Sequence, residues 1–175
     1  MIKQLRLSGS GGQGVITAAI IFAEAAVREG KNAVQSQSYG PEARGGASKA
    51  EVIISDAPIY HPKVQKPDIV LAMTQKAADK YYSDLDNAHG LLIIDEDLVP
   101  NPPAFPNIIK VPITKTAGSK LGNLIFSNIV ALGVLVKASG IVSLESAKKA
   151  VAQRVPPHTV DKNMQALELG YNSIK

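Results

Sequence analysis

The chain of 175 residues contains no cysteine and no tryptophan, and only 5% of its residues are aromatic. Without cysteine it cannot form a disulfide, ligate an iron–sulfur cluster through thiolates or build a cysteine-type zinc site. No run of five basic residues occurs, and the net charge is only +4. Because nucleic-acid-binding proteins normally cluster Lys and Arg on one element, the composition disfavours that class.

Long apolar runs are also lacking. The longest apolar segment, "NLIFSNIVALGVLV" (residues 123–136), is too short to span a bilayer and carries two asparagines. Polar residues interrupt the N-terminal "MIKQLRLSGSGG" before the apolar region of a signal peptide can form. We therefore expect a cytoplasmic protein that contacts neither a membrane nor nucleic acid. Its 45% hydrophobic residues are enough for a proper core at this length.

Apolar runs of strand length alternate with segments of helix length. The pattern predicts strands at residues 2–8, 31–37, 49–55, 68–73, 90–97 and 107–113. It predicts helices at residues 14–29 and 74–85 and at about 118–138, 143–153 and 159–172. This alternation is typical of an α/β, Rossmann-like fold with a mostly parallel sheet, helices on both faces and a helical C-terminal segment. No repeat or low-complexity linker divides the chain, so we expect one domain over residues 1–175.

Two of the expected helices are apolar almost all the way round, at residues 15–27 and within residues 123–136. A helix that lies on a sheet needs only an apolar stripe. Each of these helices is therefore either deeply buried in the core or presents a face to another chain.

The segment "GSGGQG" (residues 9–14, the glycine loop) lies between the first strand and the first helix, and Gly9, Gly11 and Gly14 fit the pattern G-x-G-x-x-G. A helix start offers free N–H groups and a positive dipole end, and glycine lets a phosphate approach the backbone. Alternatively, the glycines only permit a sharp turn. We favour an anion-binding loop, with side-chain donors from Ser10 and Gln13; its residues are Gly9, Ser10, Gly11, Gly12, Gln13 and Gly14.

A dinucleotide site requires more than this loop. The second strand should end in Asp or Glu, about 20 residues on, to bond the ribose hydroxyl. Here the strand ends in Gln35, Ser36 and Gln37, with no carboxylate. A standalone NAD(P)-binding oxidoreductase is therefore the alternative and not the preferred function.

The segment "SQSYGPEARGGAS" (residues 36–48, the second loop) follows the second strand. Its Arg44 carries a planar guanidinium suited to phosphate or carboxylate, and Gly45 and Gly46 free the backbone beside it. The loop should emerge at the same sheet edge as the glycine loop, where ligands bind in open α/β folds. The residues alone also allow a surface pair of Arg44 with Glu42 in a structural loop.

The two loops together resemble a known family. "GSGGQGVITAA" and "SYGPEARGGASKAEVIISD" are similar to the gamma subunit of the 2-oxoacid:ferredoxin oxidoreductases. "PDIVLAMTQ", "GLLIIDEDLV", "SNIVALGVL" and "ALELGYNSI" follow in the family's order, so the resemblance covers essentially the whole chain. "SYGPEARGGASKAEV" looks closer to the 2-oxoglutarate branch, or its branched-chain relative, than to the pyruvate branch.

The resemblance implies a subunit of an enzyme that converts 2-oxoglutarate, coenzyme A and oxidised ferredoxin to succinyl-CoA, CO2 and reduced ferredoxin. The chain would not be catalytic alone. Thiamine diphosphate, Mg²⁺ and the iron–sulfur clusters would be held by alpha and beta subunits, with or without a ferredoxin-like delta subunit. The gamma subunit would close the thiamine diphosphate site and contribute to the coenzyme A site at its interface.

The same resemblance implies the residues that bind coenzyme A. These are the glycine loop, Tyr39, Arg44, Gly45 and Gly46 of the second loop, and Asn128 in "SNIVALG". Asn128 lies in an apolar helix, as does Asn123, and a buried Asn must find hydrogen-bond partners. A third alternative is a purely structural assembly subunit that holds no ligand.

Two weaker candidates follow from residue type. The acidic "DED" (residues 95–97) comes after a strand and is more typical of a solvated cap than of a metal site. His61, His89 and His158 show no paired spacing, so surface or structural roles are expected for them.

Overall fold

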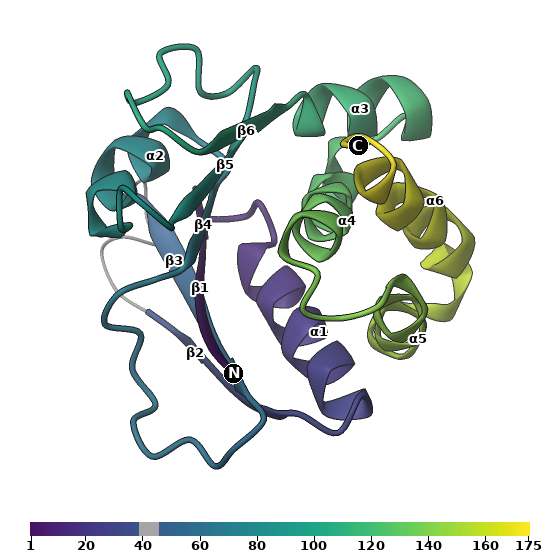
Figure 1. The fold of residues 1–175 in the computed structure, drawn as a ribbon. Coiled ribbons are helices and arrows are strands. Elements are labelled where there is room, and N and C mark those ends of the chain that lie inside the picture. Colours follow the sequence, from purple (N-terminus) through teal and green to yellow (C-terminus); the bar gives the residue numbers. More distant parts are fainter. Residues whose placement is uncertain (39–45) are drawn as a thin grey trace.

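The strands form one twisted sheet (Figure 1). The structure is a computed structural model that describes residues 1–38 and 46–175. Within these residues the sheet has six strands in the order β2-β3-β1-β4-β5-β6. The strands are β1 (Ile2–Gly9), β2 (Asn32–Gln37), β3 (Ser48–Ser55), β4 (Ile69–Ala72), β5 (Leu91–Asp95) and β6 (Ile108–Val111).

The mostly parallel sheet expected from the sequence is confirmed, with β3 as the reversed strand. β1 pairs in parallel with β4, β4 with β5, and β5 with β6. β3 is antiparallel to both of its neighbours, β1 and β2. No helix is described between β2 and β3, and a parallel pairing of adjacent strands would need a long crossover connection. The short return therefore inverts β3.

Helices cover both faces of the sheet, as expected (Figure 1). α2 and the short turn η2 lie on one face, and the other helices lie on the opposite face. The helices are α1 (Val15–Arg28), α2 (Gln75–Tyr81), η2 (Tyr82–Asp84), α3 (Ile113–Leu121), η3 (Leu124–Phe126), α4 (Ser127–Ser139), α5 (Leu144–Arg154), η4 (Pro157–Thr159) and α6 (Val160–Tyr171). Two clusters of buried apolar side chains correspond to the two faces.

The single helix expected at about residues 118–138 is wrong, because the chain breaks there into α3 and α4. Gly122 adopts φ 73°, the left-handed conformation that ends a helix, and its N–H donates to the Gly118 carbonyl at 3.1 Å. The Asn123 side chain then accepts from the Ile125 N–H and starts η3. The sequence did contain a signal for this break, since Gly122 can end a helix and Asn123 can cap a new one.

α4 is buried on almost every side. Of the two alternatives for this apolar helix, burial in the core is therefore the correct one, and not a face presented to another chain. Its residues from Ile129 to Val136 are all buried. α6 crosses α4 closely: a Cβ added at Gly133 would lie 2.1 Å from the Leu167 carbonyl oxygen, and one added at Gly170 would lie 1.9 Å from that of Val130. The close approach of the two backbones requires glycine at both positions.

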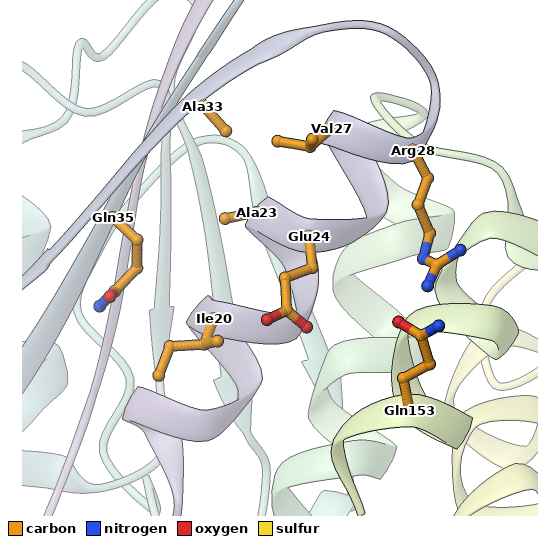
Figure 2. Close-up of a pocket in the computed structure, with 8 residues that line it drawn as sticks. All are labelled: Ile20, Ala23, Glu24, Val27, Arg28, Ala33, Gln35 and Gln153. Atoms are coloured by element: carbon orange, nitrogen blue, oxygen red, sulfur yellow. The ribbon is translucent and has the colours of Figure 1, made fainter.

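α1 packs one side on the sheet and leaves an outer strip accessible. Its Phe22 is fully buried, which contributes about 1.5–3 kcal/mol. A hollow of about 440 Å³ lies between α1 and strand β2, lined by Ile20, Ala23 and Val27 together with polar side chains (Figure 2). Val27 is 57% exposed. A face of α1 given to another chain would therefore include this strip.

Candidate functional site

The glycine loop lies where successive strands begin to be added on the opposite side of β1. From β1 the chain passes through α1 to β2 on one side, whereas β4, on the other side of β1, leads through α2 to β5. α1 and α2 lie on opposite faces (Figure 1). The carboxyl ends of β1 and β4 therefore form a topological switch point, the place where open α/β sheets bind ligands.

Gln13 fixes the shape of the glycine loop. Its Oε1 accepts a hydrogen bond from the Ser10 N–H at 2.8 Å, and its Nε2 donates to the Met73 carbonyl at 3.4 Å. A Cβ added at Gly9 would lie 2.4 Å from Gln13 Oε1. The Gln13 carboxamide therefore links the loop to the end of β4, and the side-chain donor expected from the sequence is already used within the protein.

The start of α1 keeps its backbone donors free. Gly14 stands at the N-cap with φ 78° and offers no side-chain cap. Within residues 1–38 and 46–175, the N–H groups of residues 11, 12 and 14–17 donate to no protein atom. A hollow of about 360 Å³ (the loop hollow) lies against them, lined by Ser10, Gly11, Gly12, Gly14, Val15, Ile16, Ser38 and Ser48. Such free donors at a helix start can bind an anion.

Asn128 is brought to this loop by α4. Its Nδ2 donates to the Gly14 carbonyl oxygen at 3.3 Å. A Cβ added at Gly14 would lie only 2.6 Å from the same Nδ2, so glycine is required by contact as well as by its positive φ. Asn123 lies apart from the loop and caps η3.

Ser38 and Ser48, near the two ends of the second loop, also line the loop hollow, although the sequence did not single them out as candidates. Ser48 lies opposite Gly9 in the register of β3 on β1, and its Oγ donates to the Gly9 carbonyl at 3.2 Å. Ser38 Oγ is buried and has no partner among the described residues. Both positions depend on cross-strand pairing, for which the sequence carries no local signal.

The second loop starts and ends at the expected edge. β2 ends at Gln37 and β3 begins at Ser48, opposite Gly9, so both ends lie beside the glycine loop. Gly46 is half-buried there. Tyr39, Arg44 and Gly45 lie outside the described residues.

Asp95 of the "DED" segment is a buried cap, so the expectation of a solvated cap is wrong for this residue, whereas Glu96 and Asp97 are exposed as expected. Its side chain is fully buried. It accepts hydrogen bonds from the Asp97 N–H at 3.1 Å, from the Thr114 N–H at 2.9 Å and from the Thr114 hydroxyl. These bonds join the end of β5 to the start of α3. In the described part of the chain, no three His, Asp or Glu side chains are grouped as metal ligands.

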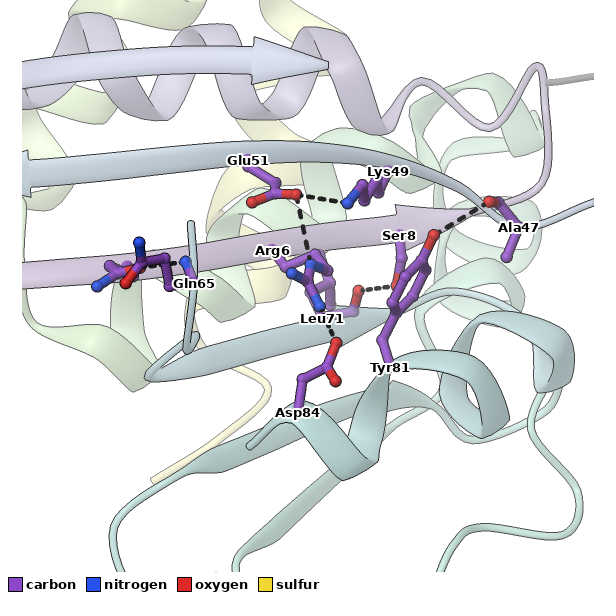
Figure 3. Close-up of polar contacts among 10 residues, drawn as sticks. Arg6, Ser8, Ala47, Lys49, Glu51, Gln65, Leu71, Tyr81 and Asp84 are labelled. Atoms are coloured by element: carbon purple, nitrogen blue, oxygen red, sulfur yellow. Dashed lines mark hydrogen bonds and ion pairs between the residues drawn. The ribbon is translucent and has the colours of Figure 1, made fainter. Parts of the chain in front are cut away.

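A buried ion network on the α2 face was not foreseen. Arg6, which is 5% exposed, forms ion pairs with Glu51 at 3.6 Å and with Asp84 (Figure 3). Its guanidinium carbon lies 5.0 Å from the centre of the Tyr81 ring. Lys49 Nζ lies 2.8 Å from Glu51. The network ties β1 and β3 to η2.

The family model of pyruvate ferredoxin/flavodoxin oxidoreductases matches residues 4–173. The chain belongs to this family. It is 48% identical to the 2-oxoglutarate synthase subunit KorC of Methanocaldococcus jannaschii, over all of this chain and 95% of that protein. The crystal structure of a keto/oxoacid ferredoxin oxidoreductase gamma subunit from Geobacter sulfurreducens superposes with a TM-score of 0.91 at 47% identity, over 99% of this chain and 96% of that one.

A larger member of the oxidoreductase group shares the fold at lower identity. The 2-oxoglutarate:ferredoxin oxidoreductase from Magnetococcus marinus, solved with 2-oxoglutarate, coenzyme A and succinyl-CoA bound, superposes with a TM-score of 0.81 at 20% identity. The match covers 97% of this chain and 30% of that chain. The gamma-subunit fold thus also occurs as part of a much longer polypeptide.

These matches confirm the family resemblance drawn from the two loops. They also favour a ferredoxin-linked enzyme subunit over a standalone NAD(P)-binding protein, in agreement with the absence of a carboxylate at the end of β2. Among the described helices, none has the length and apolarity needed to cross a membrane.

Proposed function

We propose that this chain is the gamma subunit of a 2-oxoglutarate:ferredoxin oxidoreductase. That enzyme converts 2-oxoglutarate and coenzyme A to succinyl-CoA and CO2 and passes the electrons to ferredoxin. The observation that carries the proposal is the 48% identity to KorC along the whole chain. The subunit acts in the cytoplasm as one domain.

Partner subunits supply the redox chemistry in this proposal. The chain has no cysteine and so offers no thiolate to an iron–sulfur cluster. Alpha and beta subunits, with or without a ferredoxin-like delta subunit, hold the clusters, thiamine diphosphate and Mg²⁺. This chain closes over the thiamine diphosphate site and contributes binding groups for coenzyme A.

The loop hollow fits a phosphate group of coenzyme A. Free N–H groups at the start of α1 face it, and a helix of 14 residues adds the positive end of its dipole. Coenzyme A carries a pyrophosphate and a 3′-phosphate and needs no acidic reader of a ribose hydroxyl. The Magnetococcus marinus enzyme with the same fold was solved with coenzyme A bound.

Each site residue has a role in this proposal. Gly11, Gly12 and Gly14 give their N–H groups to the phosphate. Ser10 lines the hollow, while Gly9, Gln13 and Asn128 hold the loop in shape. Tyr39, Arg44, Gly45 and Gly46 of the second loop add contacts at the same edge, with the Arg44 guanidinium as a second phosphate ligand.

The test compares two glycines at the two ends of α1. Gly12 has φ +86° and Gly30 has φ +78°, and an added Cβ would meet no atom within 4 Å at either position. Both alanine variants therefore carry a similar backbone strain, but only Gly12 lies at the loop hollow. Ala keeps its N–H but disfavours the φ of +86°, so Gly12→Ala should turn this N–H away from the ligand. In the assembled enzyme the variant should raise the KM for coenzyme A about tenfold, as expected for one misdirected charge-assisted hydrogen bond, and Gly30→Ala should leave the KM unchanged.

Three outcomes would count against the proposal. An unchanged KM for coenzyme A in Gly12→Ala would favour a purely structural subunit. Tight binding of NADH by the isolated chain would favour the standalone oxidoreductase. Saturation binding of coenzyme A that does not change in Arg44→Ala would remove Arg44 from the site.

A further inference from the structure

The hydroxyl of Tyr81 binds the backbone that leads into β3. Tyr81 is the last residue of α2 and is 4% exposed. Its hydroxyl donates to the Ala47 carbonyl at 3.3 Å (Figure 3). Ala47 is buried too, and in the described part of the chain no backbone N–H donates to its carbonyl. Because a buried carbonyl needs a hydrogen-bond partner, the Tyr81 hydroxyl supplies the partner that the sheet does not.

The Tyr81 ring is held in place by a buried cation. The guanidinium carbon of Arg6 lies 5.0 Å from the ring centre, a distance at which a cation is attracted to an aromatic face. Arg6 is buried and is fixed in turn by its ion pairs with Glu51 and Asp84. Close packing leaves such side chains little room to change rotamer. The Tyr81 hydroxyl is therefore fixed relative to β1 and β3.

The peptide unit that Tyr81 holds leads directly to Ser48. The Ala47 carbonyl belongs to the peptide unit that joins Ala47 to Ser48, and a peptide unit is planar. A hydrogen bond to this carbonyl therefore fixes the direction in which the chain enters Ser48. The Ser48 hydroxyl donates to the Gly9 carbonyl at 3.2 Å, and Ser48 lines the loop hollow. The contact thus passes from the α2 face of the sheet to the glycine loop through the backbone.

The Gly9 carbonyl belongs to the peptide unit at which the glycine loop begins. The N–H of this unit is that of Ser10, and it donates to Gln13 Oε1 at 2.8 Å. Both ends of the unit are thus held by side chains, one from β3 and one from the loop itself. Its plane sets the course of the chain into Gly11 and Gly12, which line the loop hollow.

We propose that Tyr81 is a positioning residue of the coenzyme A site. Its hydroxyl holds the peptide unit before Ser48, and the Ser48 hydroxyl holds the peptide unit after Gly9. The free N–H groups of the glycine loop thereby keep one direction. Tyr81 does not line the loop hollow and acts only through these contacts. The inference rests on the proposed function, in which the glycine loop binds a phosphate of coenzyme A.

The experiment compares two adjacent tyrosines. Tyr81→Phe removes the hydroxyl and keeps the ring beside Arg6. Tyr82→Phe is the matched control, because the Tyr82 ring packs on the same apolar cluster and its hydroxyl makes no hydrogen bond to a described residue. Initial rates of the assembled enzyme give kcat and the KM values for coenzyme A and for 2-oxoglutarate.

Tyr81→Phe should raise the KM for coenzyme A about two- to fivefold, the effect of one neutral hydrogen bond. It should leave kcat and the KM for 2-oxoglutarate unchanged, and Tyr82→Phe should change none of the three. A role in stability alone would lower kcat through a smaller folded fraction and leave the KM for coenzyme A unchanged. That result would overturn the proposal, and so would an equal rise in this KM for Tyr82→Phe.

A double variant tests the route through Ser48. Ser48→Ala removes the hydrogen bond to the Gly9 carbonyl and should by itself raise the KM for coenzyme A about three- to tenfold. If Tyr81 acts through Ser48, adding Tyr81→Phe to Ser48→Ala should raise the KM no further, because effects of coupled residues are not additive. Fold-changes that multiply in the double variant would show that Tyr81 does not act through Ser48.

Gly12→Ala separates this inference from the proposed function. If Gly12→Ala raises the KM for coenzyme A and Tyr81→Phe does not, only the positioning role of Tyr81 is refuted. If Gly12→Ala leaves this KM unchanged, the proposed coenzyme A site is refuted, and the positioning role with it.

Discussion

The side chain of Asn128 donates a hydrogen bond to the carbonyl of Gly14, 114 residues earlier in the chain, at 3.3 Å. This contact joins the start of α4 to the start of α1. It orients the peptide unit at which the free N–H groups of α1 begin. A residue of the C-terminal helical half thereby shapes the N-terminal loop.

Removal of the Asn128 carboxamide should weaken coenzyme A binding through the loop. Asn128→Ala leaves the Gly14 carbonyl with the Ala18 N–H as its hydrogen-bond partner and frees space beside the glycine. We expect a three- to tenfold higher KM for coenzyme A and a loss of about 1 kcal/mol in the free energy of unfolding. Asn123→Ala is the control, since it removes a local cap of η3 and should leave the KM unchanged. An equal KM effect of both variants would contradict the assignment.

Gln13→Glu should damage binding more than folding. The carboxylate can still accept from the Ser10 N–H but can no longer donate to the Met73 carbonyl. It also places a negative charge beside the phosphate site, where like charges repel. We expect the KM for coenzyme A to rise more at low than at high ionic strength, because salt screens the repulsion. Gln13→Leu, which lacks the charge, should show no such salt dependence in initial-rate measurements.

The crossing of α4 and α6 should tolerate no side chain at Gly170. An added Cβ would lie 1.9 Å from the Val130 carbonyl oxygen, so the helices must separate. We expect Gly170→Ala to lower the free energy of unfolding by about 2–4 kcal/mol in denaturant titrations. Gly118→Ala is the matched helical control: its Cβ would meet the Leu124 Cδ2 at 3.1 Å, on a flexible and exposed side chain. That variant should stay within about 1 kcal/mol of the wild type.

Glu29 joins the end of α1 to the start of α5, because its side chain accepts a hydrogen bond from the Ser143 N–H. This contact should make the free energy of unfolding depend on pH. Burial alone would raise the pKa of Glu29, but hydrogen bonds from Lys31, Ser143 and Ser146 lower it from 4.5 to about 2. A depressed pKa stabilises the fold above the unfolded value of 4.5, and this contribution is lost as the pH falls from about 4.5 to about 2.

The corresponding variant is Glu29→Gln. It should cost about 1–2 kcal/mol at pH 7, after allowance for solvent screening, and progressively less below pH 4.5. Glu145→Gln, on the exposed face of α5, is the control and should be nearly neutral throughout. Denaturant titrations at several pH values measure both. A cost for Glu29→Gln that is the same at pH 7 and pH 3 would show that the hydrogen bonds do not depend on the charge.

The strands and most helices could be predicted because their signals are local. Apolar runs of strand length correspond to all of the described strands, and Gly30 follows the end of α1 as expected. The reversal of β3 could not be predicted, since a buried apolar strand reads the same in either direction. The helix end at Gly122 could have been predicted from the glycine, but the apolar run that follows it was interpreted as a continuation of the same helix.

The candidate site was predictable where it depends on backbone conformation. The glycine loop was singled out because Gly9, Gly11 and Gly14 fit the G-x-G-x-x-G pattern, and in the structure Gly12 and Gly14 do have a positive φ. Long-range contacts were harder: Ser48 belongs to the loop through cross-strand register, and Arg6 enters an ion network with Asp84, 78 residues away. Asn128 was found because a motif of the resembling family includes it, not through periodicity.

The most direct test of the central claim is a structure of the assembled enzyme with coenzyme A bound. The account predicts the pyrophosphate oxygens of coenzyme A within hydrogen-bond distance of the N–H groups of Gly11, Gly12 or Gly14, in the loop hollow of this chain. Coenzyme A bound elsewhere, with the start of α1 turned away from the ligand, would contradict it.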